Sequence, residues 1–128
     1  MKNLKKWTEL ADITALKYQK VAQEYAQLRQ KDDALATQFQ AAQRRIAEVM
    51  NAQSASDDLR QAELNKVRWR RMAEAQQARL NFQRLELKMS LEATRARLAY
   101  ASGQREVSKT ILATERVKRS KRLAGRDQ

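Results

Sequence analysis

The chain contains no cysteine, no histidine and no proline, and only two glycines among its 128 residues. Sheets, barrels and βα units turn often and need Gly and Pro at their turns, so the scarcity of both excludes most such folds. The lack of Cys excludes disulfide frameworks and thiolate zinc sites. The lack of His excludes Ser-His and Cys-His nucleophile systems and most transition-metal sites. We therefore expect a protein that is not an enzyme, with no catalytic residue, no metal site and no cofactor.

The sequence also lacks a long apolar run. The longest stretch without a charged residue is residues 34–43, which still includes glutamines and a threonine, whereas a membrane span needs about 20 mostly apolar residues. The basic N-terminal residues are not followed by an apolar segment, and Glu9 and Asp12 argue against a transit peptide. These features predict a cytoplasmic protein that is peripheral to a membrane at most.

The first half of the sequence has a continuous heptad repeat. Apolar or aromatic residues fill twelve of fourteen a/d positions, and the exceptions are Thr14 and Asp32. The fourteen positions are Leu4, Trp7, Ala11, Thr14, Tyr18, Val21, Tyr25, Leu28, Asp32, Leu35, Phe39, Ala42, Ile46 and Val49. Such a sustained pattern is typical of a coiled coil. It predicts one helix over about residues 3–50, roughly 70 Å long at 1.5 Å per residue.

A cluster of small polar residues follows this helix and predicts a bend at about residues 51–56. Ser54 with Asp57 resembles a capping box, and Ser56 or the pair Asp57-Asp58 would also cap a new helix. A second helix is expected over about residues 57–122. One continuous helix with a polar patch remains an alternative, because neither Gly nor Pro enforces a stop here.

Helix periodicity separates two apolar stripes on nearly opposite faces of this second helix. The first stripe comprises Ala62, Trp69, Ala73, Leu80, Leu87, Leu91 and Leu98. The second comprises Leu64, Val67, Ala75, Ala78, Phe82, Leu85, Met89, Ala96, Tyr100, Val107 and Ile111. We expect the first stripe to pack on the first helix as an antiparallel hairpin. A bend centred near residue 54 then places Leu35 opposite Ala73, Val21 opposite Leu87, and Asp32 beside Gln76.

The second stripe would then be exposed, and an exposed apolar row of this length usually marks a partner site. One explanation is a homodimer or a four-helix bundle that buries it. Another is a hydrophobic partner groove that takes Phe82, Leu85 and Met89 as anchors.

The same register places Leu4 near Gln104, so that the rest of the second helix extends alone beyond the first. Residues 105–128 hold eight Lys and Arg against three acids, within a chain whose formal net charge is +12. Three interpretations stay open: a solvated fraying tail, a tip that enters an acidic ring or groove, and phosphate contacts with nucleic acid. A second basic cluster, residues 66–71, includes Trp69, which could stack on a base but fits the seam of the hairpin better.

Two stretches carry a family resemblance. Residues 98–112 (LAYASGQREVSKTIL) and residues 79–85 (RLNFQRL) are similar to the late and middle parts of the second helix in the stalk proteins of flagellar and virulence type III secretion (the FliJ/YscO group). The overall layout resembles that group over nearly the whole chain, although only Trp69 loosely matches its usual aromatic residue near the bend.

The resemblance implies an all-α, long two-helix antiparallel coiled-coil hairpin with an extended basic C-terminal helix, forming a single domain over residues 1–128. Such stalk proteins sit in the pore of the hexameric export ATPase, promote its assembly and activity, and contact the export gate and export chaperones. By position, the ATPase-binding candidates are Lys109, Ile111, Arg116, Lys118, Arg119, Lys121 and Arg122. The gate or partner-binding candidates are Leu64, Val67, Met72, Phe82, Leu85 and Met89.

We therefore predict a non-enzymatic central stalk that links an export ATPase to an export gate, as a monomer or a homodimer. The alternative is a basic coiled-coil adaptor or nucleic-acid-binding protein. Acids interspersed among the basic residues, and aromatics in core positions, argue against nucleic acid as the partner.

Overall fold

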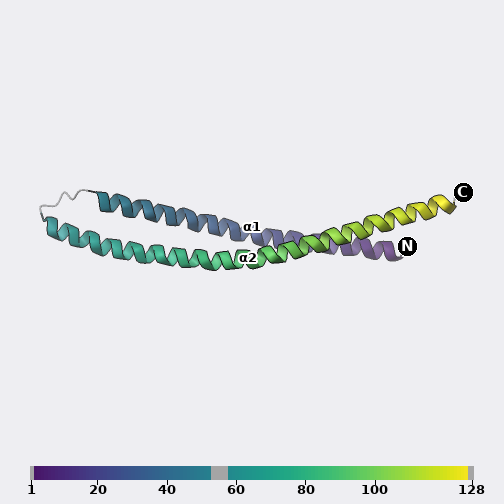
Figure 1. Ribbon diagram of the computed structural model, residues 1–128, viewed down its shortest axis with the longest axis horizontal. Helices are drawn as coiled ribbons and strands as arrows, with labels where there is room; N and C mark the ends of the chain where they lie inside the picture. The colour runs from purple at the N-terminus through teal and green to yellow at the C-terminus, as the bar shows by residue number, and fades with distance from the viewer. Residues whose placement is uncertain (1, 53–57, 127–128) are drawn as a thin grey trace. The chain divides into compact units, whose positions relative to one another are not determined.

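In the computed structural model, which describes residues 2–52 and 58–126, the protein consists of two long helices that pack against each other (Figure 1). Helix α1 is Lys2–Asn51 and helix α2 is Leu59–Arg126. No strand occurs in these two ranges. The α1 bounds lie within one residue of the expected 3–50, whereas α2 begins two residues later and ends four residues later than the expected 57–122.

An aspartate caps the start of α2. The Asp58 carboxylate oxygen Oδ1 accepts a hydrogen bond from the Gln61 backbone N–H at 3.1 Å. This bond satisfies one of the N–H groups that have no partner within the first turn of a helix. The expected capping role is therefore confirmed for Asp58, while Ser54, Ser56 and Asp57 lie outside the described residues.

The chain divides into two compact units, each built from a part of α1 and a part of α2. The terminal unit comprises Met1–Gln27 and Leu91–Gln128, and the central unit comprises Leu28–Ser90. The six described residues classed as buried all belong to the terminal unit: Thr14, Val21, Thr94, Ala101, Ser108 and Leu112. In the described part of the central unit, the residues through which its α1 and α2 segments pack together are at most half-buried.

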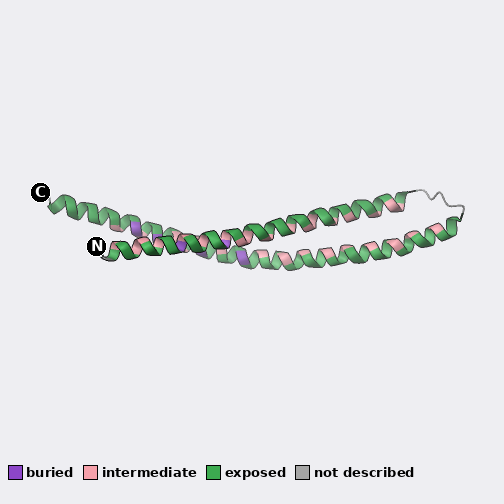
Figure 2. Cartoon of the chain, turned by 180° about the vertical axis from the view of Figure 1, so that it is seen from behind, coloured by how far each residue is buried: buried purple, intermediate pink, exposed green. Residues whose placement is uncertain are grey.

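In both units, the partly covered face of α2 is the stripe that was assigned to the seam from the sequence. Each of its seven residues, from Ala62 to Leu98, is half-buried, while the residues of the opposite stripe are exposed except for the half-buried Ile111. Figure 2 shows the half-buried and buried positions recurring along both helices among exposed ones. The choice between the two faces of α2 is therefore confirmed.

The expected axial register is wrong. In the central unit, Leu35 shares a groove with Leu87 rather than lying opposite Ala73. In the terminal unit, Val21 shares a groove with Ala101 rather than lying opposite Leu87. Both of these residues lie fourteen residues beyond the expected partner, and Arg84, which pairs with Asp32, lies eight residues beyond Gln76, so α2 is shifted by about one to two heptads. The same faces meet in either register, because a seam that repeats every seven residues is unchanged by sliding in steps of seven.

The offset originates at the bend side of the central unit. The Lys66 ammonium Nζ donates a hydrogen bond of 2.6 Å to the backbone carbonyl of Ala52, just after α1 ends. Lys66, the eighth residue of α2, is therefore within side-chain reach of the end of α1. A symmetric bend about residue 54 assumes instead that the two helix ends are level.

The corrected register also changes the C-terminal part of α2. Residues after Gln104 do not leave α1 behind, because Asn3 and Leu4 line a groove with Glu115, Lys118 and Arg119. Ser108 and Leu112 are buried, with 4% and 9% of their surface exposed. The expectation of a single uncovered helix from residue 105 onward is therefore wrong.

Gly103 lies inside α2 with an ordinary helical backbone, and a Cβ atom built on it would meet nothing within 4 Å. The helix passes through this position without interruption, so a neighbouring backbone in close contact does not explain the glycine. Gly103→Ala is expected to raise the free energy of unfolding by about 0.5–1 kcal/mol, because alanine loses less backbone entropy in a helix. Thermal unfolding followed by circular dichroism measures this change. A lower melting temperature would contradict the open environment of Gly103.

Candidate functional site

A charged pair lies in the seam of the central unit. The Asp32 oxygen Oδ1 and the Arg84 nitrogen Nε are 3.7 Å apart, and both side chains are mostly covered. The Arg84 guanidinium carbon also lies 5.9 Å from the centre of the Phe39 ring. Neither Asp32 Oδ1 nor Arg84 Nε has a hydrogen-bond partner in the described part of the chain. The expected register placed Asp32 beside Gln76, and this register error hid its charged partner Arg84.

Removing one member of this pair leaves a partly buried charge without its partner. Asp32→Ala is expected to lower the free energy of unfolding by about 1–2 kcal/mol, less than the 3–5 kcal/mol of a fully buried pair. The double variant Asp32→Leu/Arg84→Leu is expected to recover this loss, because two apolar residues fit a seam position of this kind. Urea unfolding of the single and double variants measures both effects. A double variant less stable than Asp32→Ala would show that the pair itself stabilises the seam.

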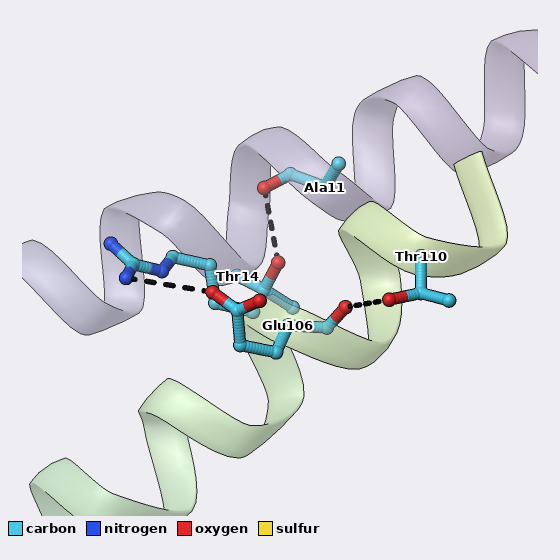
Figure 3. A network of polar contacts seen from close by, with 5 residues as sticks. Ala11, Thr14, Glu106 and Thr110 are labelled. Atoms are coloured by element: carbon cyan, nitrogen blue, oxygen red, sulfur yellow. Dashed lines mark hydrogen bonds and ion pairs between the residues drawn. The ribbon is translucent and has the colours of Figure 1, made fainter. Parts of the chain in front are cut away.

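The seam of the terminal unit contains buried hydroxyl groups and a stacked cation. Thr14 is 6% exposed, and its hydroxyl donates to the Ala11 carbonyl at 3.0 Å. Figure 3 shows Thr14 on α1 and Glu106 on α2, and the Glu106 carbonyl accepts a hydrogen bond of 2.9 Å from the Thr110 hydroxyl. The Arg105 guanidinium carbon lies 3.9 Å from the centre of the Tyr18 ring, a cation–π contact between the two helices. Of these contacts, the one between Arg105 and Tyr18 joins α2 to α1, whereas the two hydroxyl hydrogen bonds stay within one helix.

Beyond Leu112, the seam positions of α2 continue with charged side chains. The spacing of three and four residues that places Ser108 and Leu112 in the seam leads next to Glu115, Arg119, Arg122 and Arg126. These four residues line one groove together with Asn3, Leu4, Lys118 and Leu123. The groove is a continuation of the helix–helix seam whose α2 side is largely arginine. We name this groove and the neighbouring residues 116–126 the basic end.

The basic end is strongly and uniformly charged. Residues 116–126 hold six Lys and Arg and no acid. The ammonium Nζ of Lys118 lies 3.7 Å from the Glu115 carboxylate. Among the described residues, the other five cations, namely Arg116, Arg119, Lys121, Arg122 and Arg126, form no ion pair. These like charges lie close together along one stretch of helix, so an anionic partner would stabilise this segment.

Of the seven ATPase-binding candidates, five belong to the basic end. Arg116, Lys118, Arg119, Lys121 and Arg122 are all exposed. The other two lie before it, since Lys109 is exposed and Ile111 is half-buried. Arg126 and Leu4 were missed as members of the groove. Extending the heptad count past Leu112 would have found Arg126, but Leu4 required the correct register.

The six gate or partner-binding candidates all lie on α2 in the central unit and are exposed. Their exposed fractions are 47% for Leu64, 45% for Val67, 71% for Met72, 62% for Phe82, 52% for Leu85 and 73% for Met89. Five of them share one face, and Met72 is displaced from it by about 80° around the helix at 100° per residue. The exposed apolar face is therefore real, with Met72 at its margin.

Trp69 is not presented as a platform for a nucleic-acid base. It is half-buried and lines a hollow with Ala42, Arg45 and Ala73. Stacking of bases requires an accessible aromatic face. The position of Trp69 agrees with its expected place in the seam.

Residues 2–52 and 58–126 contain no group of three or more His, Cys, Asp or Glu side chains that could hold a metal ion. In the same ranges, neither helix has a segment apolar enough to cross a lipid bilayer. Comparison of the chain with protein-family models, curated proteins and solved structures gives no match. The basic end and the exposed apolar face are thus the two surfaces from which a function can be argued.

Proposed function

We propose that the chain forms an antiparallel two-helix coiled-coil hairpin and acts as a non-enzymatic stalk of a type III protein export apparatus. Its basic end binds the hexameric export ATPase, and its exposed apolar face contacts the export gate or an export chaperone. The protein works in the cytoplasm and needs neither a cofactor nor a metal.

The contacts inside each unit support the antiparallel direction. In the terminal unit, Arg97 pairs with Glu24 at 3.0 Å, while Arg105, further along α2, stacks on Tyr18, which comes earlier in α1. In the central unit, Arg84 pairs with Asp32, whereas Lys66 bonds to Ala52. In both units, residue numbers fall along α1 as those of their partners rise along α2.

The basic end is the observation that carries the proposal. Arg119, Arg122 and Arg126 are exposed and line one groove at the end of the seam, and guanidinium groups form bidentate pairs with carboxylates. A partner that presents acidic side chains on a concave surface, as the inner wall of a ring can, would satisfy five cations at once. The aligned arginines thereby favour an anionic partner whose carboxylate or phosphate groups are held in place.

Hydrolysis of ATP by a type III export ATPase, titrated with this protein, tests the proposal. The wild-type chain is expected to raise the rate, and a version that ends at Thr114 is expected to lose the effect. This version removes the basic end but keeps the buried Ser108 and Leu112, whereas a version ending at Gln104 would remove both and disturb the terminal unit. No stimulation by the folded wild-type chain would contradict the stalk.

Titration of the protein with duplex DNA at several salt concentrations distinguishes the stalk from the alternative function, nucleic-acid binding. A nucleic-acid-binding protein would show affinity that falls with log–log slope of about −0.9 per phosphate neutralised. Binding of this kind without ATPase stimulation would replace the stalk by a nucleic-acid role for the same basic end.

A further inference from the structure

The exposed face of α2 in the central unit has a regular pattern. Eight positions, spaced three or four residues apart, follow one side of the helix: Leu64, Val67, Arg71, Ala75, Ala78, Phe82, Leu85 and Met89. We name this set the outer row. It is opposite the seam, because Trp69, Ala73 and Leu80 are half-buried while all eight members are exposed. Spacing of this kind is that of a second helix–helix seam.

We propose that a second copy of the chain covers the outer row, with the two rows antiparallel and related by a two-fold axis between Ala75 and Ala78. The interface is isologous, as two-fold symmetry requires. The proposal goes beyond the export function and concerns the state of the free protein.

The sizes of the side chains along the row are self-complementary. In the antiparallel arrangement, Leu64 lies opposite the partner's Met89, and Val67 lies opposite the partner's Leu85. Small residues, Ala75 and Ala78, meet at the centre, where they allow the two helices to approach closely. Large apolar residues thus face large ones at both ends, and within one chain Leu64, Val67, Leu85 and Met89 are all exposed.

The only charged member of the row also finds a suitable neighbour. Arg71 lies opposite the partner's Phe82, where its guanidinium can stack on the ring. Phe82 is 62% exposed within one chain, so its face is free for this contact. A parallel, in-register pairing would instead bring the two copies of Arg71 together and repel them.

Charges on the flank of the row show the same two-fold relation. Arg68 and Glu86 are exposed, and neither forms an ion pair in the described part of the chain. They are eighteen residues apart, which is five full turns, so they project from the same flank about 27 Å apart. They cannot meet within one chain, but Arg68 lies beside the partner's Glu86 in the antiparallel dimer, and the axis generates this pair twice.

The dimer and the proposed gate contact use the same residues. A gate or chaperone that binds Leu64, Phe82 and Met89 must therefore displace the second copy. Failure of the dimer would leave the proposed ATPase contact at the basic end untouched, because that contact belongs to the terminal unit.

Sedimentation equilibrium of the full chain, over about 1–500 μM, tests the proposal, since this range covers weak to moderate association. A reversible monomer–dimer equilibrium is expected for the wild type. Leu85→Asp is expected to weaken it at least about a hundredfold, because it places a carboxylate against the partner's apolar Val67 at both symmetry-related positions. Arg79→Asp, an exposed substitution beside the row, is the control and should leave dimerisation nearly unchanged.

Charge reversal across the two-fold axis distinguishes the antiparallel dimer from any other association. Arg68→Glu and Glu86→Arg alone should each weaken the dimer about tenfold, because each creates two like-charge contacts. The double variant should regain wild-type affinity, and so should an equimolar mixture of the two single variants. A wild type that stays monomeric throughout the range, or single variants without mutual rescue, would overturn the proposal.

Discussion

Replacing Leu80 by aspartate is expected to destabilise the protein far more than replacing Leu85 by aspartate. Leu80 is half-buried in the seam of the central unit, whereas Leu85 is 52% exposed on the outer row. Leu80→Asp removes apolar contacts and brings a carboxylate to a covered position, at a cost of about 2–3 kcal/mol. Leu85→Asp leaves its carboxylate in water, so the free energy of unfolding should change by about 0.5 kcal/mol or less.

The two leucines form a matched pair, since they lie five residues apart in one helix and receive the same substitution. Urea unfolding at low protein concentration compares them without a contribution from dimerisation, which Leu85→Asp would also affect. Equal losses of stability would contradict the opposite faces of α2, and a larger loss for Leu85→Asp would reverse their assignment.

Reversing three charges at the basic end is expected to abolish the stimulation of the export ATPase. The variant Arg119→Glu/Arg122→Glu/Arg126→Glu changes the side chains that line the groove beside Leu4. Each reversal turns an attraction for a carboxylate into a repulsion, worth about 1 kcal/mol at an exposed site. Together they should weaken binding by about a hundredfold. A concentration of the protein that saturates the ATPase in the wild-type experiment should then no longer do so.

A matched control separates this effect from net charge alone. The variant Arg44→Glu/Arg79→Glu/Arg95→Glu makes the same change in charge at exposed positions without ion pairs. It should retain most of the stimulation. Cations near a helix C-terminus interact favourably with the helix dipole. Replacing the three groove arginines by Gln removes these cations without adding negative charge, so its effect on the thermal stability of the helix can be measured separately. Equal loss in the control would mean that the ATPase responds only to overall charge.

Much of the architecture follows from the sequence, because it depends on periodicity. The a/d positions from Leu4 to Val49 predict which side of α1 is covered, and the seven residues from Ala62 to Leu98 predict the covered side of α2. Both assignments rest on the angle between successive residues of a helix, which is the same in every helix. The cap at Asp58 likewise follows from local chemistry, since an aspartate before a helical segment accepts the free N–H groups.

The register does not follow from the same pattern. Leu35 is an equally good neighbour for Ala73 and for Leu87, because both occupy seam positions two heptads apart. The choice depends on how the ends of α1 and α2 are offset near the bend, where Lys66 bonds to Ala52. Such an offset is a property of a few side chains and backbone atoms, and periodicity carries no information about it.

The same limit applies to the candidate surfaces. The outer row could be found from the sequence because it repeats along a helix face. The groove at the basic end could not, since it joins Leu4 to Arg119 and Arg122, which are more than a hundred residues away in the sequence. The charge of this surface can therefore be predicted from the sequence, but the residues that line its groove cannot.

The length of α1 determines how much of the arginine-lined face of α2 is exposed. One heptad corresponds to about 10 Å along the helix. Lengthening α1 at its start by seven residues would carry it over Arg122 and Arg126, and shortening it by seven would uncover Glu115 and Leu112. The reach of the charged tip can thus be tuned in discrete steps of one heptad by insertions or deletions in α1, without altering any residue of α2.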